Sequence, residues 1–550
     1  MVKNYKRSLN IYLLLFFLLQ LYFIFKSGTT WDDEGLLRGT LRVFEKVRVF
    51  FREPDNPFLG DFDYNLEFYG YFALVIIYFL SEIIQNINFV YLAGKIFNST
   101  IVGLDHEIII SRNIALSIYL IIFLYLIYYE LEKLIDNRTA FWFVLYLTSI
   151  PNFSGHSLFN IKDITFALHL FYVFLYFFNK SHELFDNEKF EIKKLVIFGF
   201  VFSLPLLIRI NAIAFLVFIP LVFLNKFLVN LRSNKDLIKK LLIFNLKWLT
   251  IFILSFVNLI IFSPSSWSNI KNWILLSYET QFNLPWGGDT LTNGIFYSVD
   301  IVPWNYLFIW FSHKLPTLVI IFFVLGSFKN IYNSSNFVST YSLYFILYVL
   351  ILFIIFKPGV YDEIRQFLFL IPFIVLVFTE FVINLKTRFN FRILVFLFLY
   401  LLIPNFQFQE FKYVYYNEFT SLNSITNNKC TEIDGCGKWL SDYWGYSGKE
   451  IISKTENYFI KNNVDEEILI CRPTNVFNPF INTTNNLVFR EDFNSINNKN
   501  VFYIVNIHRP MKNYSSCNLP NEINCEVVEK SYIKIFKNNI NLSYLQKCGY

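Results

Sequence analysis

The chain has 550 residues, a mean hydropathy of +0.42 and 16% charged residues, whereas soluble domains carry roughly 25% charge. Its apolar residues fall into runs of roughly 14–25 that are separated by short polar loops, a pattern typical of a chain that crosses a bilayer repeatedly. These features exclude an ordinary soluble domain. The net charge of +6 is modest and gives no indication of a nucleic-acid partner.

We predict an all-α polytopic membrane domain over residues 1–404, of the type that crosses the bilayer about eleven times. The first span resembles a signal peptide because Lys3, Lys6 and Arg7 precede its apolar run, but no small-residue cleavage site follows and we expect it to be retained. The predicted spans are 9–26, 110–128, 139–155, 164–178, 195–208, 211–225, 241–262, 313–328, 338–356, 366–384 and 391–404.

Residues 67–93 form a further apolar stretch, which contains Glu67 and Glu82. A span at this point would reverse the charge balance of every later loop. We therefore expect this stretch to be re-entrant or to lie along the outer interface.

Loop charges predict the orientation. Lys and Arg are concentrated in the N-terminus and in 129–138, 179–194, 226–240 and 385–392, which the positive-inside rule places in the cytoplasm. The remaining loops and everything after residue 405 then lie outside. For a bacterial inner membrane that side is the periplasm.

Residues 405–550 are predicted to form a small extracytoplasmic α/β domain, with a helix over 448–463 and strands over 466–472 and 501–507. All six cysteines lie in this tail, which favours disulfides in an oxidising compartment. A zinc site is disfavoured because no C-x-x-C pair occurs. The pairing stays open among Cys430, Cys436, Cys471, Cys517, Cys525 and Cys548.

Charged residues close to a bilayer are costly and are therefore functional candidates. The first candidate cluster is "TTWDDEGLLRG" (29–39), where three adjacent carboxylates, Asp32, Asp33 and Glu34, repel one another. Such repulsion raises the pKa of at least one of them, as a general base requires. The alternative is a solvated loop that opens a helix with acids at its N-terminus. The helix that follows is amphipathic, with Leu37 and Phe44 on its apolar face, and is expected to lie on the outer leaflet.

The second cluster is "GHSLFNIKD" (155–163), which brings His156, Asn160, Lys162 and Asp163 into one short outer loop. A helix start capped by Asp163 is the alternative explanation, and it is compatible with function.

Two further clusters contain arginines near the outer surface. Arg209 lies in the tight turn "LLIRINAI" (206–213), and Arg365 lies in "KPGVYDEIRQFLFLIP" (357–372) just before a span. Snorkelling or interfacial anchoring is the alternative for both. The arginine fork matches a phosphate, so these residues also suit an anionic lipid headgroup. Carboxylates and cations on one side of the membrane fit a reaction between a lipid-borne phosphate and a hydroxyl acceptor. No phosphate-binding loop or metalloprotease motif occurs in a credible context.

The set of motifs resembles the multi-span glycosyltransferases that use polyprenyl-phosphate sugars, the GT-C fold, and most closely glycosyltransferase family 39, which includes the protein O-mannosyltransferases and the lipid A aminoarabinose transferase. The resemblance covers most of residues 25–450. Asp33-Glu34, Asp163, Arg209 and "YDEIRQFLFLIP" match the family pattern in order, and "VPWNYLFIWFSHKLP" (302–316) and "YVYYNEF…DYWGYS" (413–447) resemble bacterial members. The chain departs from the pattern in carrying Asp32 before the acidic pair and Gln366 where relatives often have His.

The resemblance implies an inverting transfer of a sugar from a polyprenyl phosphate to a hydroxyl on a lipid, glycan or protein. Asp33 or Asp32 would be the base, with Glu34 beside it, and Lys162, Arg209 and Arg365 would bind the donor phosphate. His156 and Asp163 would position the donor or the acceptor. No cofactor is expected, because the donor arrives already linked to lipid. Relatives work without an obligatory metal, so none is expected here, although the acidic clusters could bind one.

Three other interpretations compete with this one. A lipid-linked saccharide transporter or flippase would also carry outer charges, but transporters usually place charge at the bilayer midplane and show internal repeats. An O-antigen ligase or polymerase would favour arginine-rich loops without an acidic pair. A sensory or adhesin-like protein would leave the four clusters unexplained.

Overall fold

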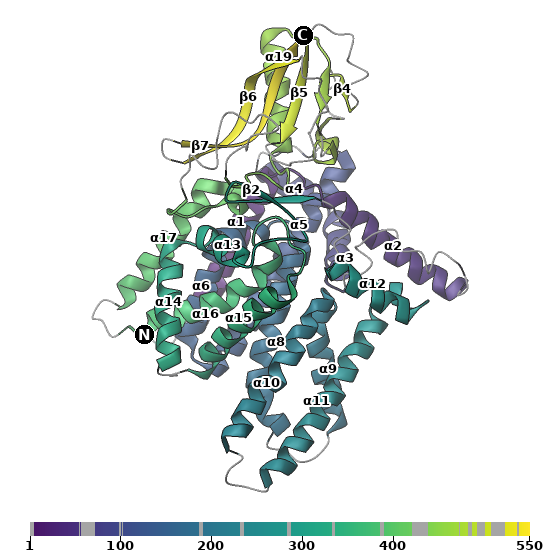
Figure 1. Ribbon diagram of the computed structural model, residues 1–550. Coiled ribbons are helices and arrows are strands. Elements are labelled where there is room, and N and C mark those ends of the chain that lie inside the picture. The colour runs from purple at the N-terminus through teal and green to yellow at the C-terminus, as the bar shows by residue number, and fades with distance from the viewer. Residues whose placement is uncertain are drawn as a thin grey trace.

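Figure 1 shows the computed structural model, in which helices form the body of the molecule and a small sheet stands at one end with the C-terminus. The N-terminal end lies away from that sheet. The structure describes residues 5–53, 56, 72–97, 99, 101, 103–185, 191–230, 236–282, 288–332, 336–385, 390–420, 438–471, 474–481, 487–491, 501–507, 523–535 and 538–549.

The helical body is built from elements of both halves of the chain. The first half contains α1 (Tyr5–Lys26), α2 (Asp33–Arg52), α3 (Phe72–Asn86), α4 (Phe89–Ile96), α5 (Gly103–Leu134), α6 (Asn137–Ser149), α7 (Pro151–His156), α8 (Ile161–Phe185), α9 (Ile192–Leu206), η4 (Ile210–Ala212), α10 (Ile213–Asn230) and α11 (Asp236–Ile261). The second half contains η5 (Pro264–Ser266), α12 (Ile270–Phe282), β1 (Asp289–Thr292), β2 (Ile295–Ser298), α13 (Tyr306–Lys314), α14 (Thr317–Tyr332), α15 (Phe337–Phe356), η6 (Arg365–Leu370), α16 (Ile371–Ile383), α17 (Asn390–Phe408) and η7 (Gln409–Val414).

Within the described residues, seven helical segments are long and apolar enough to cross a membrane, so the chain is an integral membrane protein. They are 5–26, 103–134, 161–181, 242–261, 337–356, 365–383 and 391–414. The other four predicted spans are also helical but short or broken. Residues 139–155 divide into α6 and α7 at Pro151, and α9 and α14 have 15 and 16 residues. The fourth is divided between η4 and α10.

The apolar stretch predicted at 67–93 is described from Phe72 onward, and its first five residues lie outside the described part. It folds as α3 and α4, which meet at an angle of 73° around Asn88. This geometry belongs to a broken span or a re-entrant loop, so the expectation of a re-entrant or interfacial stretch stays a prediction.

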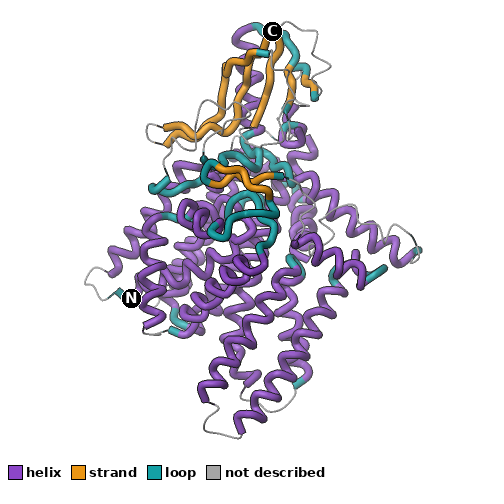
Figure 2. Tube along the Cα trace, in the orientation of Figure 1, coloured by secondary structure: helices purple, strands orange, loops and turns teal. Residues whose placement is uncertain are grey.

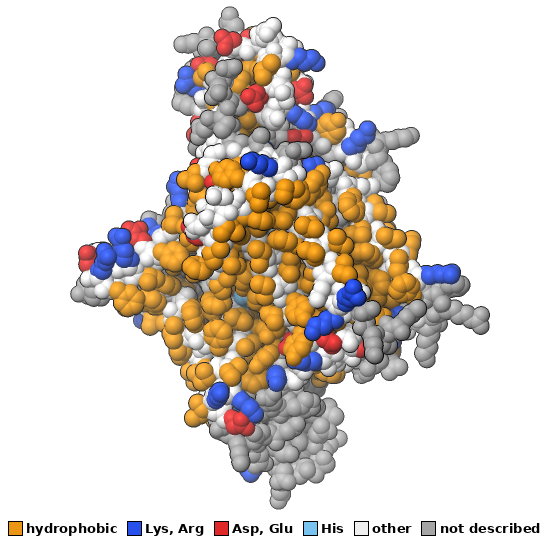
Figure 3. All heavy atoms as spheres, turned by 180° about the vertical axis from the view of Figure 1, so that it is seen from behind, with side chains coloured by type: hydrophobic (Ala, Val, Ile, Leu, Met, Phe, Trp, Pro, Cys, Tyr) orange, Lys and Arg blue, Asp and Glu red, His pale blue; other side chains and the backbone are white. Residues whose placement is uncertain are grey.

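Helix α2 projects from the body beside α12 (Figure 1). Its buried face carries Leu36 and Val43, whereas Leu41, Phe44 and Phe51 on the predicted apolar face are 47%, 42% and 76% exposed. A helix with an exposed apolar stripe and several arginines suits the outer interface. In Figure 3, hydrophobic side chains cover most of the helical body and charged side chains gather at its margins.

The strands are confined to the C-terminal end, apart from the small hairpin β1–β2 (Figure 2). The sheet has the order β4-β3-β5-β7-β6, with parallel pairs β4–β3 and β3–β5 and antiparallel pairs β5–β7 and β7–β6. The domain that contains this sheet comprises α19 (Gly448–Asn462), β3 (Ile468–Ile470), η8 (Thr474–Val476), α20 (Asn478–Ile481), β4 (Phe489–Arg490), β5 (Val501–Ile507), β6 (Asn524–Ile535) and β7 (Asn538–Gly549). The predicted α/β character, helix and two strands are confirmed, whereas the β6–β7 hairpin was not predicted.

The predicted disulfides are described in part, and their pairing was left open by the sequence. Cys525 in β6 and Cys548 in β7 form a disulfide between directly opposed residues, and Cys471 is also disulfide-bonded. The remaining three cysteines, Cys430, Cys436 and Cys517, lie outside the described residues.

Several contacts join the sheet domain to the body. The far end of the β6–β7 hairpin places Ile533, Ile535, Ile540 and Leu542 in the same apolar cluster as the membrane helices. The segment 438–447, between η7 and α19, also buries its aromatic side chains in that cluster. The C-terminal domain is therefore packed directly on one end of the helical body.

Candidate active site

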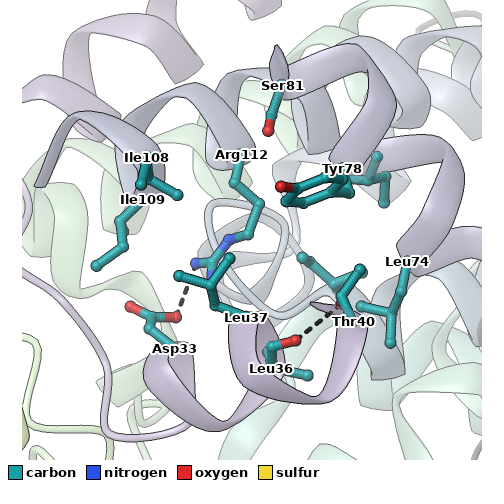
Figure 4. Close-up of a pocket in the computed structure, with 12 residues that line it drawn as sticks. Asp33, Leu36, Leu37, Thr40, Leu74, Tyr78, Ser81, Ile108, Ile109 and Arg112 are labelled. Atoms are coloured by element: carbon teal, nitrogen blue, oxygen red, sulfur yellow. Dashed lines mark hydrogen bonds and ion pairs between the residues drawn. The ribbon is translucent and has the colours of Figure 1, made fainter. Parts of the chain in front are cut away.

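Asp33, one of the two predicted bases, opens α2 and is buried, with 3% of its surface exposed. The Arg112 guanidinium donates to its Oδ1 over 2.7 Å (Figure 4). The Thr30 N–H donates to its Oδ2 over 2.6 Å. The adjacent cavity of about 20 Å³ is apolar on most sides and has room for about one water. Both carboxylate oxygens of Asp33 are therefore held by the protein. Arg112 was not predicted, and the available signal was an arginine at the outer start of a span.

Asp32 has a different environment, because 26% of its side chain is exposed. Its Oδ2 lies 3.8 Å from the Lys162 ammonium and 3.6 Å from the Arg365 guanidinium, and it makes no hydrogen bond. These contacts join the loop after α1 to the start of α8 and to η6. The predicted proximity of the acidic turn and the Lys162 loop is confirmed.

Asp163 lies in the first turn of α8 and is buried. It forms an ion pair with Arg209, and its Oδ2 accepts a hydrogen bond from the Asn160 amide over 2.8 Å. The Asn160 Oδ1 accepts the Asp163 N–H over 3.1 Å. The prediction that Asp163 caps this helix is wrong, because Asn160 is the capping residue and leaves the Asp163 carboxylate available to the two arginines.

Arg365 connects the two carboxylates. Its guanidinium lies 3.6 Å from Asp32 and 3.8 Å from Asp163, and it is hydrogen-bonded to Asp362 over 3.1 Å. Arg209 extends from the turn between α9 and η4 to the other side of Asp163. The cluster therefore consists of the cations Lys162, Arg209 and Arg365 and the carboxylates Asp32, Asp163 and Asp362, which lie within one largely buried region.

Aromatic rings enclose Arg365. The Trp444 ring lies 4.3 Å from its guanidinium carbon and the Tyr361 ring lies 4.8 Å from it. The Trp444 carbonyl accepts the Trp31 N–H over 3.2 Å, so the segment 438–447 is fixed to the acidic turn. We call the segment 438–447, whose Trp444 covers the Arg365 guanidinium, the roof of the site. The roof was not predicted as part of the site.

Two of the predicted site residues differ from the rest in their surroundings. Glu34 forms an ion pair with Arg38 on the exposed side of α2 and does not reach the cluster. The His156 Nδ1 is hydrogen-bonded to the Asn160 amide over 3.0 Å, and Asn160 in turn bonds Asp163. The His156 Nε2 faces the Tyr443 hydroxyl at 3.2 Å. Among the described residues, no group of three or more His, Cys, Asp or Glu side chains could hold a metal ion.

No family model and no curated protein matches the chain. Among solved structures, it is similar to the crystal structure of ArnT from Cupriavidus metallidurans bound to undecaprenyl phosphate. The TM-score is 0.45 and the identity is 9%, over 100% of this chain and 98% of that one. The assignments below rest on the residues of this chain and not on that likeness.

A large apolar cavity adjoins the cluster. It has a volume of about 470 Å³ and lies between α8, α10, α15 and η6. Arg209, a member of the cluster, is the charged side chain among the residues that line it, and Phe215, Phe345 and Phe369 are among the aromatic ones. The wall is mainly apolar, a composition typical of small-molecule sites.

We expect His156 to make stability depend on pH. Burial lowers its pKa to about 3, whereas the unfolded chain binds the proton near 6.5. The unfolded state therefore takes up a proton as the pH falls through 6.5, and stability is lost by about 1.4 kcal/mol per pH unit below that point.

The measurement is the thermal midpoint of the detergent-solubilised protein between pH 7.5 and 4.5. A His156→Gln variant is less stable at pH 7.5, because the bonds to Asn160 and Tyr443 change, but its midpoint falls less steeply on acidification. An equal slope in both proteins contradicts the expectation.

Proposed function

We propose that the chain is a membrane glycosyltransferase that moves a sugar from a polyprenyl phosphate to a hydroxyl acceptor at the outer face of the membrane. The observation that carries the proposal is the position of the cluster. Cations suited to a phosphate and carboxylates suited to a hydroxyl meet at one end of an apolar cavity.

The cavity is the proposed site of the first part of the polyprenyl chain. Its wall is mainly aliphatic and aromatic, so an isoprenoid gains from leaving water, and Arg209 stands at the end where a phosphate would lie. Lys162 and Arg365 then approach the phosphate from the other side. Bidentate arginine contacts favour a phosphate over a neutral headgroup.

Asp32 is the better candidate for the base, because its contacts are the ones a phosphate can replace. Its oxygen lies at 3.6 and 3.8 Å from two cations, without a hydrogen bond. A phosphate that takes over these cations leaves Asp32 as a partly exposed acceptor. Asp33 is committed to Arg112 and Thr30 and acts as a positioning residue for the turn.

In the proposed step, the acceptor oxygen bonds to the anomeric carbon while the bond from that carbon to the phosphate oxygen breaks. The acceptor proton passes to Asp32, and the polyprenyl phosphate leaves with the bonding electron pair. Attack opposite the leaving group inverts the anomeric centre. Arg209, Lys162 and Arg365 stabilise the charge that grows on the phosphate in a region shielded from water by Trp444.

The proposed location is the bacterial inner membrane, with the N-terminus cytoplasmic and the cysteine-bearing domain in the periplasm. The loop charges and the disulfide between Cys525 and Cys548 support this orientation. The acceptor class, whether lipid, glycan or protein, follows from the assay below.

The test is reconstitution of the purified protein in liposomes with a radiolabelled polyprenyl-phosphate sugar and membrane extract. Label that moves from the lipid to a new product supports transfer. Unmodified donor that moves between leaflets supports a transporter and contradicts the proposal. If the label neither enters a new product nor moves between leaflets, the result would point to a binding protein. Consumption of a polymeric lipid-linked saccharide in place of a single sugar would favour a ligase or polymerase.

A further inference from the structure

The ion pair between Lys314 and Glu363 is fully buried, and Glu363 lies two residues before Arg365 in the chain. The pair takes no part in the step proposed above. Lys314, at the end of α13, places its Nζ 2.5 Å from Oε2 of Glu363, and the two side chains are 0% and 1% exposed. Burial raises the pKa of Glu363 to about 7 and lowers the pKa of Lys314 to about 8. These shifts indicate that burying the two charges is costly, so net stability does not account for the pair.

Several elements converge on Glu363. The Tyr416 hydroxyl donates to its Oε1 over 2.8 Å, and the Tyr306 hydroxyl donates to its backbone carbonyl over 3.1 Å. Lys314 in turn donates to the Tyr413 carbonyl over 3.2 Å and lies 3.7 Å from the centre of the Tyr416 ring. The carboxylate is thus fixed by α13 and by the chain that follows η7.

The backbone at this point is strained. Asp362 and Glu363 have φ angles of 54° and 65°, in the left-handed region that residues with a Cβ atom rarely adopt. Two consecutive residues of this kind persist only where the surroundings over-determine them. Their side chains serve different partners: Asp362 holds Arg365 over 3.1 Å, and Glu363 holds Lys314.

We propose that the Lys314–Glu363 pair is a lock that keeps the turn at 361–364 in its left-handed conformation and thereby holds Arg365 between Asp32 and Asp163. Lys314 and Glu363 are positioning residues, and this role rests on the proposed function because Arg365 acts there on the donor phosphate. Without the lock the turn relaxes, and Arg365 shifts away from the two carboxylates.

The first test is a double-mutant cycle on sugar transfer with Glu363→Gln and Arg365→Gln. Glu363→Gln keeps the shape of the side chain and an acceptor for Tyr416, and we expect a loss of about tenfold in kcat with the donor KM within about twofold, because the phosphate gains its charge in the transition state. In the Arg365→Gln background the same substitution is expected to cause no further loss, because there is no guanidinium left to position. An additive loss overturns the proposal.

The second test separates positioning from folding. A Lys314→Met/Glu363→Gln variant removes both charges, so its thermal midpoint is expected to return to or above the wild-type value. Transfer is expected to stay about tenfold low, since the turn is no longer held. Recovery of activity together with stability overturns the lock. The control is Glu130→Gln. Glu130 is another buried carboxylate, which pairs with Lys133 near the end of α5 opposite to Arg112, and its substitution is expected to leave transfer unchanged.

Hydrogen–deuterium exchange makes the result independent of activity. Amide exchange in a peptide covering residues 357–368 is expected to be at least several-fold faster in Glu363→Gln than in the wild type. If exchange is faster in Glu363→Gln but the wild-type protein transfers no sugar, the proposed function fails and the lock stands. If the wild type transfers sugar and neither exchange nor transfer changes in the variant, the lock fails alone.

Discussion

An Asp32→Asn variant is expected to fold normally and to lose about 10²–10⁴ in kcat, the range contributed by a positioned general base. The amide cannot accept the acceptor proton. The folded state loses little, because the Asp32 side chain does not cap α2, its Oδ2 makes no hydrogen bond, and its two ion contacts are long. Initial transfer rates at saturating donor, with the thermal midpoint as a folding check, provide the measurement.

Asp33→Asn is the matched comparison, because it makes the same chemical change at the neighbouring position. Here the expected effect is mainly on stability. Removing the charge leaves Arg112 buried without its carboxylate, a change that typically costs about 3–5 kcal/mol. A stable but inactive Asp33→Asn protein beside a fully active Asp32→Asn protein would assign the base to Asp33. Full activity in both, and in the double variant, would remove the base from this turn.

Arg365→Gln is expected to lower kcat by about 10²–10³, as the removal of a preorganised charge-stabilising group does in other active sites. Arg365 approaches two carboxylates and lies against the Trp444 ring, so its fork cannot be replaced by water at the same position. The measurement is again the transfer rate, together with the affinity for the proposed polyprenyl-phosphate donor, which should weaken.

The control for Arg365 is Arg38→Gln. Arg38 is 65% exposed on α2 and pairs with Glu34, so its loss removes the same charge from the protein without touching the cluster. Transfer should stay within about twofold of the wild type. Equal losses in both variants would indicate a general electrostatic effect on lipid binding in place of a specific role for Arg365.

Much of the cluster could be predicted from sequence because charged residues are rare near the bilayer. Asp32, Lys162, Asp163, Arg209 and Arg365 each stand out beside long apolar runs, and the structure brings all five together. Loop charges also predicted that the acidic turn and the Lys162 loop share a side. The same reasoning gave Glu34 a role, although its position on the outer face of α2 separates it from the others.

The residues that were missed depend on contacts between distant segments. Arg112 lies near the start of the predicted span 110–128. Its pairing with Asp33 follows from the packing of α2 near the start of α5. Trp444 lies in an aromatic segment whose position over Arg365 no local pattern specifies. The predicted spans 139–155, 211–225 and 313–328 run across breaks, before Pro151, between η4 and α10 and between α13 and α14, because hydropathy does not detect such breaks.

The roof over Arg365 has a consequence for how the chain can be divided. Trp444, Tyr443 and Tyr446 belong to the segment that leads into the sheet, yet they are buried against the membrane helices. A protein truncated after residue 404 would keep every predicted span but would open the guanidinium to bulk water. The raised local dielectric would weaken each ion pair of the cluster. The smallest unit able to keep the cluster in this arrangement therefore extends past the last transmembrane helix to residue 447.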